Sequence, residues 1–460
     1  MARAVAEEIR EDMRETPEIA TRTWHPVTRV LFRFVFVYLG IGLAAGWLAI
    51  ALLKALHVPL RTVADVQDWW QLPVLTNWFG SAFFGIEKIN YVGTGSGDTQ
   101  VFWVAAFTWL VVAAVVAAVW SVLDRRRPAY PRLHEWFRLT LRFALGLALV
   151  LYGTVKVMPS QMVFELQRLV EPFGDMSPMG ALWSQTAASE PYEIALGVAE
   201  LAAAALLFLP WTVTAGALLS FVATLQIFLL NLSFDVPVKL YSGQLVLLSL
   251  VLAAPQIGRI ARVLLGRAVP AEPATPLFTG RLGKRIFAVG YTVLALFLIG
   301  DQVHQSWDAW HHYGSAQARS PLYGIWNVTE FTMAGQDMPA LVDDNSPPHE
   351  YGDASLGPQR LRRLIFDAAD GVTVQRMDES LVWFPATVDP DKQTVAFTGD
   401  VTGIFKIGTF RYERPEDGKL VLDGQISGRP VRMALDQVDL NRYPLVARGF
   451  HWVQDVPYRR

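Results

Sequence analysis

The chain has 460 residues, enough for two or three domains, of which 52% are hydrophobic and only 18% are charged. Soluble domains carry about a quarter charged residues, so this composition indicates a membrane protein. A formal net charge of −2 predicts no nucleic-acid partner. The chain has no cysteine. This absence excludes thiol–disulfide catalysis, cysteine-ligated iron–sulfur clusters, covalent c-type haem and structural disulfides.

Seven hydrophobic runs reach the length of about 20 residues that a membrane-spanning helix needs. The residues before the first run are charged and mostly polar, and that run is too long for the core of a cleavable signal peptide. We therefore expect it to act as an uncleaved signal anchor. The predicted spans are 30–53, 101–123, 139–158, 191–209, 211–232, 239–256 and 285–302.

Arginine and lysine gather in three segments that a seven-span chain places on one side: before span one, between spans two and three, and between spans six and seven. The positive-inside rule puts that side in the cytoplasm. The N-terminus is then cytoplasmic, and everything after Asp301 is extracytoplasmic. The predicted parts are a cytoplasmic segment (1–29), two spans with an outer aromatic loop (30–138), a four-helix bundle (139–256), a cytoplasmic loop with the seventh span and a linker (257–320), and an extracytoplasmic β domain (321–460).

From residue 321 onward, short β-type runs alternate with turn signals such as Asp370-Gly371 and Asp417-Gly418, which antiparallel hairpins favour. The sequence thus predicts an α-helical membrane part of about seven spans, with a four-helix bundle, followed by an antiparallel β barrel or sandwich. The expected strands are 325–333, 362–367, 372–376, 381–388, 394–397, 404–413, 420–426 and 431–436.

Ionisable groups inside a spanning helix are candidates for function because their burial in lipid is costly. Glu200 lies nine residues after Pro191, roughly 13 Å into the hydrocarbon at 1.5 Å per residue. Lys156 could extend toward it, and Tyr152 lies one turn below Lys156 on the same helix face. We expect an outward-facing polar pocket for a quinone head group or a small polar substrate. Further candidates for its lining are Gln226, Asn231, Asp235, Lys239, Tyr241, Ser242 and Gln244. The alternative is an ion pair between Glu200 and Lys156 that only fixes helix register.

Other polar segments carry weaker signals. The glycine-rich loop 93–99 could cradle an anion or metal, but it lacks the lysine of a P-loop, which favours a tight turn. Acidic and histidine side chains follow the last span. Two of them, spaced to lie on one helix face, could bind a divalent metal, but the sequence identifies no third ligand. These weak candidates are His304, Asp308, His311 and His312.

Three apolar patterns concern packing. Gly42 and Gly46 form a small-xxx-small motif, which favours close helix packing within the chain over a dimer interface. The aromatic-rich loop 57–100 suits a segment lying along the outer membrane interface. In the loop 159–191, apolar residues from Met162 to Phe173 predict a short amphipathic helix at the outer mouth of the bundle.

The segment from Arg138 to about Arg262 resembles the DoxX family of bacterial membrane proteins. The resemblance rests on Arg142, on Tyr152-Gly153-x-x-Lys156, and on Gly197-x-x-Glu200 followed by Leu-Ala-rich sequence. It implies a four-helix membrane bundle in the bacterial cytoplasmic (inner) membrane and a link to quinone-dependent sulfur oxidation, with quinone as the implied cofactor. Further stretches, among them 95–99, 177–180, 235–239 and 448–452, are similar to a long DoxX-like subgroup with a C-terminal extension.

The first strand of the β domain contains Tyr323-Gly324-Ile325-Trp326, which is similar to the Gly-x-Trp opening of lipocalin-like barrels. In those barrels a late arginine packs over the tryptophan, and Arg448 is the expected counterpart. The resemblance implies a calyx that holds a ligand. The alternative is a solid core in a domain used for protein contact.

Three functions therefore remain open, and the sequence leaves it undecided whether the protein is an enzyme. The first is the membrane subunit of a quinone-linked redox system, which needs an electron partner because the chain has no GxGxxG-opened βαβ unit and no cysteine ligands. The second is non-catalytic handling of a lipid or other hydrophobic ligand. The third is a scaffold for an envelope complex. Membrane lipids and envelope proteins are the expected partners.

Overall fold

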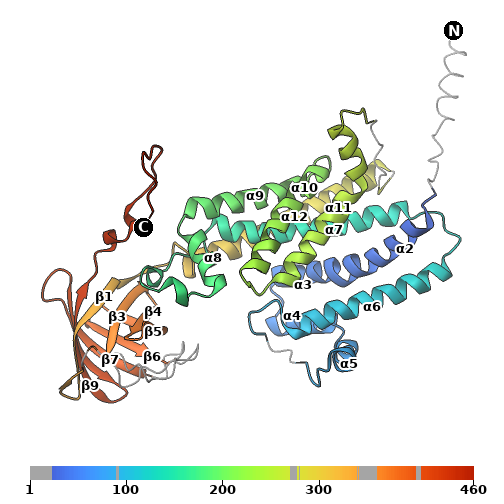
Figure 1. The fold of residues 1–460 in the computed structure, drawn as a ribbon. Coiled ribbons are helices and arrows are strands. Elements are labelled where there is room, and N and C mark those ends of the chain that lie inside the picture. Colours follow the sequence, from blue (N-terminus) through green and yellow to red (C-terminus); the bar gives the residue numbers. More distant parts are fainter. Residues whose placement is uncertain are drawn as a thin grey trace, which may run out of the picture. The chain divides into compact units, whose positions relative to one another are not determined.

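A computed structural model describes residues 23–89, 93–269, 277–278, 280–338, 340, 360–399 and 406–459. The chain divides into two compact units, which we describe one at a time (Figure 1). The helical unit comprises residues 1–153 and 199–303, and the barrel unit comprises residues 154–198 and 304–460. Most of the predicted N-terminal segment 1–29 lies outside the described residues.

Seven helices in the described part of the chain are long and apolar enough to cross a membrane, which confirms the predicted number of spans. The first span is continuous over Pro26–Ala55 and consists of three labelled parts. The last helix continues past its predicted apolar core, which ends at residue 302, as far as His312. The spans are α2 (Pro26–Val35), η1 (Phe36–Ala45) and α3 (Gly46–Ala55), then α6 (Gln100–Leu123), α7 (Pro131–Val157), α9 (Glu190–Phe208), α10 (Val213–Ser233), α11 (Lys239–Leu264) and α12 (Arg281–His312).

The middle part of the first span, η1, is a π-helix of ten residues. The small-xxx-small motif spans the junction of η1 and α3, and its two glycines face tryptophans of the same chain. A Cβ on Gly42 of η1 would lie 2.8 Å from the Trp109 ring, and one on Gly46 of α3 would lie 2.7 Å from Nε1 of Trp70. Trp70 Nε1 also donates a 3.1 Å hydrogen bond to the carbonyl oxygen of Gly42. The prediction that these glycines serve packing within the chain is therefore confirmed.

The aromatic loop after the first span folds into two helices, α4 (Leu60–Trp70) and α5 (Pro73–Phe84). Trp70 and Phe79 pack inward, whereas the other large aromatic side chains of the pair are exposed. Exposed aromatic side chains on short amphipathic helices suit the interfacial location that the sequence predicts. The exposed aromatic residues are Trp69, Trp78, Phe83 and Phe84.

The β domain is an up-and-down antiparallel barrel in which each strand pairs with the next and β1 also pairs with β9, closing the sheet. β2 is a two-residue extension beside the end of β1, so the other eight of the nine strands form the barrel. All eight predicted strands are confirmed, with boundaries shifted by a few residues. They are β1 (Arg319–Met333), β3 (Leu361–Ala368), β4 (Gly371–Arg376), β5 (Leu381–Asp389), β6 (Thr394–Thr398), β7 (Lys406–Glu413), β8 (Lys419–Ile426) and β9 (Arg429–Gln437), with β2 at Gln336–Asp337.

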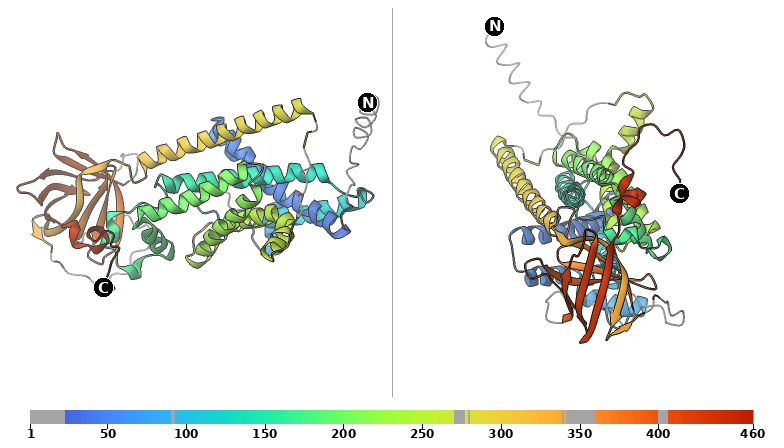
Figure 2. Two further views of the ribbon diagram at one scale, coloured as in Figure 1. Left: turned by 90° about the horizontal axis from the view of Figure 1, so that it is seen from above. Right: turned by 90° about the vertical axis from the view of Figure 1, so that its left-hand side faces the viewer.

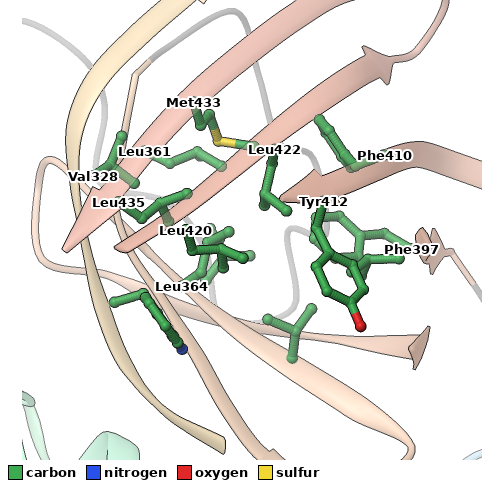
Figure 3. Packing of buried hydrophobic residues seen from close by; sticks show 14 of the residues in the cluster. Val328, Leu361, Leu364, Phe397, Phe410, Tyr412, Leu420, Leu422, Met433 and Leu435 are labelled. Atoms are coloured by element: carbon green, nitrogen blue, oxygen red, sulfur yellow. The ribbon is translucent and has the colours of Figure 1, made fainter. Parts of the chain in front are cut away.

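Large apolar side chains fill the interior of the barrel, as Figure 3 shows for part of the cluster. Phe397 and Phe410 are fully buried, with their ring centroids 5.3 Å apart, and Leu364, Leu420 and Leu422 are equally buried. Side chains of this size at successive inward positions give the barrel an apolar interior. The ligand-holding calyx and the solid core both stay predictions.

The loop between α7 and α9 does not form the predicted amphipathic helix over 162–173. Only two short 3₁₀ turns occur there, η2 (Leu166–Leu169) and η3 (Phe173–Asp175), followed by α8 (Pro178–Ala187). The apolar side chains instead pack on the outer wall of the barrel, where Leu166 joins Ile325 and Ile365 in a buried cluster. The apolar residues are spaced as in an amphipathic helix, but they are apolar because they contact the barrel. These tertiary contacts, rather than the helical spacing, determine the local structure.

Candidate functional site

The buried face of α9 carries Glu200, whose side chain is only 3% exposed. Ala203, Ala204 and Leu207 follow on the same face and are also buried. This spacing of three and four residues is that of a helix face turned toward its neighbours. The apolar period of α9 thus places one carboxyl group among apolar side chains of the helical unit.

A chain of aromatic contacts leads from this carboxyl group across three other helical segments. Glu200 lies near enough to Tyr152 of α7 for its charge to act on the phenol. The ring of Tyr152 is 6.0 Å from that of Tyr241 on α11, and Tyr241 is 4.6 Å from the ring of Trp47 on α3. The structure therefore brings together three of the predicted pocket residues, Tyr152, Glu200 and Tyr241.

The π-helix of the first span adds a further residue that the sequence did not predict. Tyr38 of η1 hydrogen-bonds with Gln244, which lies three residues after Tyr241 on the same face of α11. π-Helical segments occur frequently at functional sites, and this one borders the cluster. We name the group formed by Tyr38, Trp47, Tyr152, Glu200, Tyr241 and Gln244 the Glu200 cluster.

The remaining predicted pocket residues of the helical unit belong to other surroundings. Asn231 is buried and donates a 3.0 Å hydrogen bond from Nδ2 to Oγ of Ser242, which ties α10 to α11. Gln226 is exposed on α10, so the structure does not place it in the Glu200 cluster. Asp235 has a side chain that is 82% exposed and pairs at 2.7 Å with Lys239.

The glycine-rich loop 93–99 caps the start of α11. The two carboxylate oxygens of Asp98 accept hydrogen bonds from the backbone N–H groups of Lys239 (2.8 Å) and Leu240 (2.9 Å). The Lys239 ammonium also lies 3.7 Å from Asp98 Oδ2, and Gly97 N donates to Pro237 O at 2.8 Å. A carboxylate at a helix N-terminus satisfies otherwise unpaired N–H groups, so this loop and Lys239 have a structural role.

In the barrel unit, Lys156 near the end of α7 is 5% exposed, and its charge acts on Glu193 near the start of α9. Glu193 is 1% exposed and accepts a hydrogen bond from the backbone N–H of Met162, while its Oε1 has no hydrogen-bond partner among the described residues. Glu193 was not predicted as a site residue because it lies just after the predicted helix start. Its position two turns before Glu200 on one face was the available signal. An ion pair of Lys156 with Glu200 stays a prediction.

The histidines after the last span are engaged locally. His304 Nε2 lies 3.6 Å from Asp308 Oδ2, and both side chains are mostly exposed. His311 and His312 each use Nδ1 to contact a backbone oxygen one turn earlier, at 2.9 and 2.7 Å. Within the described ranges no group of three or more His, Cys, Asp or Glu residues could hold a metal ion.

The tryptophan of the Gly-x-Trp motif is buried at one end of the barrel, and its partner differs from the predicted one. The Arg414 guanidinium lies 6.0 Å from the Trp326 ring and donates a 3.0 Å hydrogen bond to Pro321 O. Arg448 instead stacks on Tyr458 at 4.1 Å, so the prediction for Arg448 is wrong. A pocket of about 410 Å³ lies beside Arg414 and Trp326 and is also lined by Pro415, Glu416, Asp417, Gly418 and Gln437.

Comparison with known proteins adds no relative: no family model, no curated protein and no solved structure matches this chain. The geometry of the described residues is therefore what carries the functional argument.

Proposed function

We propose that the helical unit is a DoxX-like membrane bundle that binds a quinone head group at the Glu200 cluster and serves as the membrane subunit of a redox system. The observation that carries this proposal is a buried carboxyl group within electrostatic range of a tyrosine, with buried apolar side chains on the same helix face. Such a group is expensive in a membrane and is a functional candidate for that reason.

The residues present fit a quinone. The phenol groups of Tyr152 and Tyr241 are hydrogen-bond donors for carbonyl oxygens, and the rings of Tyr241 and Trp47, 4.6 Å apart, supply flat apolar surface. A bound quinone would supply two-electron, two-proton redox chemistry. Glu200 would hold or release a proton beside the head group, and the surrounding apolar helices would exclude water.

The electrons would have to pass to a partner protein. The chain has no cysteine and therefore no thiolate ligands for an iron–sulfur cluster. Placement in the bacterial inner membrane, with the N-terminus in the cytoplasm and the barrel outside, belongs to the same proposal and is supported by the distribution of arginine and lysine between the loops.

The test is quinone binding by the full chain in lipid nanodiscs, measured by the quenching of tryptophan fluorescence with decylubiquinone. We expect Glu200→Gln and Tyr152→Phe to weaken binding at least tenfold. Glu190→Gln is the matched control, because Glu190 lies on the same helix and is exposed. Unchanged affinity in Glu200→Gln, or equal loss in Glu190→Gln, would sink the proposal.

A second candidate function is a scaffold for an envelope complex, favoured by one observation. Trp383 on β5 is 50% exposed, so the barrel offers a large aromatic side chain on its outer surface for protein contact. A stable partner that co-purifies with the full chain, and that is lost when barrel surface residues are changed, would support the scaffold. A chain that purifies alone would count against it.

A further inference from the structure

The C-terminal tail, residues 444–459, carries an exposed apolar surface. After β9 and a 3₁₀ turn (η4, Leu440–Arg442), the chain forms the four-residue helix α13 (Pro444–Ala447) and then leaves the barrel as a segment without regular secondary structure (Figures 1 and 2). Four of its side chains are at least three-quarters exposed: Phe450 76%, Trp452 91%, Val453 78% and Val456 76%. Contiguous apolar exposure of this kind marks an interaction surface.

The tail combines these apolar groups with positive charge. Residues 444–460 contain three arginines, Arg448, Arg459 and Arg460, against the single acidic residue Asp455. Tryptophan, tyrosine and arginine are the side chains that settle at the level of lipid head groups, with their rings in the apolar region and their charges toward water. A net positive segment is also attracted to anionic lipids.

Local contacts hold the tail in a defined shape. The Arg448 guanidinium lies 4.1 Å from the centroid of the Tyr458 ring and donates a 3.0 Å hydrogen bond to Gln454. The rings of Phe450 and Trp452 meet edge to face at 5.0 Å. The tail therefore folds back on itself and presents an aromatic pair at its tip.

The tail also begins beside a segment that leaves the membrane part. Leu440 and Tyr443 pack against the cluster that contains Leu166, Leu169 and Val170 of the loop joining α7 to α9. Both of these helices are candidate membrane spans. The tail therefore begins next to the connection between two candidate spans, residues 158–189.

We infer that the tail is a membrane-interface anchor, which inserts Phe450, Trp452, Val453 and Val456 into the leaflet on the barrel's side while its arginines meet anionic head groups. This inference does not depend on quinone binding. The aromatic side chains at the end of α12 in the same unit, Trp307 (51% exposed) and Tyr313 (74% exposed), are the kind that mark this interface level.

The absence of native cysteine allows a direct test with single-cysteine spin labels in the full chain. Trp452→Cys is compared with Lys392→Cys, a control in the exposed β5–β6 turn, both in nanodiscs containing phosphatidylglycerol. We expect the label at position 452 to collide more with oxygen than with a water-soluble nickel complex, and the label at 392 to show the reverse. Equal accessibility at the two positions overturns the anchor, and so does a label at 452 that is shielded from both reagents, which indicates a protein contact.

The charge component has its own test. With the label at 452, replacing Arg448 and Arg459 by glutamine should reduce immersion in phosphatidylglycerol nanodiscs to the value seen in phosphatidylcholine nanodiscs. High salt should likewise reduce the immersion of the label at 452 when both arginines are retained. Immersion that ignores both lipid charge and salt would overturn the role of anionic lipid. Because the tail is exposed, far-ultraviolet circular dichroism should show unchanged folding in these variants.

Discussion

The backbone N–H of Leu166 donates a 2.8 Å hydrogen bond to Oδ2 of Asp367, which joins the loop after α7 to strand β3. Gln375 Nε2 reinforces the junction by donating to Val170 O at 3.2 Å. Around these bonds lie the apolar side chains of Leu166, Ile325 and Ile365. The junction therefore combines a carboxyl group with an apolar shell, and that combination makes its stability depend on pH.

Burial raises the pKa of Asp367 above its usual value, an effect that outweighs the hydrogen bond from Leu166. In the folded protein this carboxyl group binds a proton more readily than in the unfolded chain. Its contribution to stability is therefore full below the unfolded pKa of about 3.9 and falls as the pH rises through the folded pKa. Asp367→Asn keeps an acceptor oxygen without the charge.

We expect Asp367→Asn to raise the melting temperature of the full chain at neutral pH. The variant should also lose less melting temperature than the parent protein as the pH rises from about 3.9 through the folded pKa of Asp367. Asp367→Ala leaves the Leu166 N–H unpaired and should destabilise the junction by about 1–2 kcal/mol. Hydrogen–deuterium exchange of the segment 160–170 locates the effect. Equal behaviour of the two variants would contradict this account.

A second prediction concerns the close approach at Gly46. A Cβ there would lie 2.7 Å from Trp70 Nε1, so Gly46→Ala must displace the indole and should cost about 1–3 kcal/mol. Gly290→Ala on α12 is the matched control, since nothing lies within 4 Å of its added Cβ. Thermal unfolding in detergent compares the two variants, and equal melting temperatures would refute the packing role of Gly46.

A third prediction concerns the cap on α11. Asp98→Ala removes the acceptor of two backbone N–H groups and should destabilise the helix start by about 1 kcal/mol, with faster amide exchange at Lys239 and Leu240. Asp98→Asn should retain part of this protection. If Asp65→Ala, at an exposed position on α4, speeds the same exchange as much, the cap is not the cause.

A fourth prediction separates the two arginines of the barrel unit. Arg414→Ala loses the contact with the Trp326 ring and the hydrogen bond to Pro321. The backbone amides of β1 should therefore exchange their hydrogens faster, which corresponds to a loss of about 1 kcal/mol in the free energy of opening. Arg448→Ala should leave the free energy of opening of β1, as measured by amide exchange, within about 0.5 kcal/mol of the parent protein. The reverse order would restore Arg448 as the partner of the tryptophan.

The elements of this fold could be predicted from sequence because their signals are local. Apolar runs of spanning length revealed seven helices, and turn pairs such as Asp417-Gly418 separated eight strands. The apolar residues of 162–173 misled because their partners, Ile325 on β1 and Ile365 on β3, lie far away in the sequence. Similarly, nothing local distinguishes Arg414 from Arg448 as the partner of Trp326.

The candidate site was predicted in part. A carboxyl group in an apolar run is visible in sequence, which is why Glu200 stood out together with Tyr152 and Tyr241. Tyr38 and Trp47 were missed because aromatic residues in a first span are equally common at lipid-facing positions. The polar residues near the start of α11 were assigned to the pocket because sequence cannot show that Asp98, about 140 residues earlier, binds that helix end.

The π-helix also determines which way the first span faces. Tyr38 and Trp47 are nine residues apart, and at 3.6 residues per turn they would lie on opposite sides of a regular α-helix. At about 4.4 residues per turn, the wider π-helical winding between them rotates both to nearly the same side. That rotation matches their partners, since Gln244 and Tyr241 share one face of α11. The winding of η1 thus determines the rotation of Tyr38 relative to Trp47 about the helix axis. Deleting one residue within 36–45 would turn one of the two side chains away from α11.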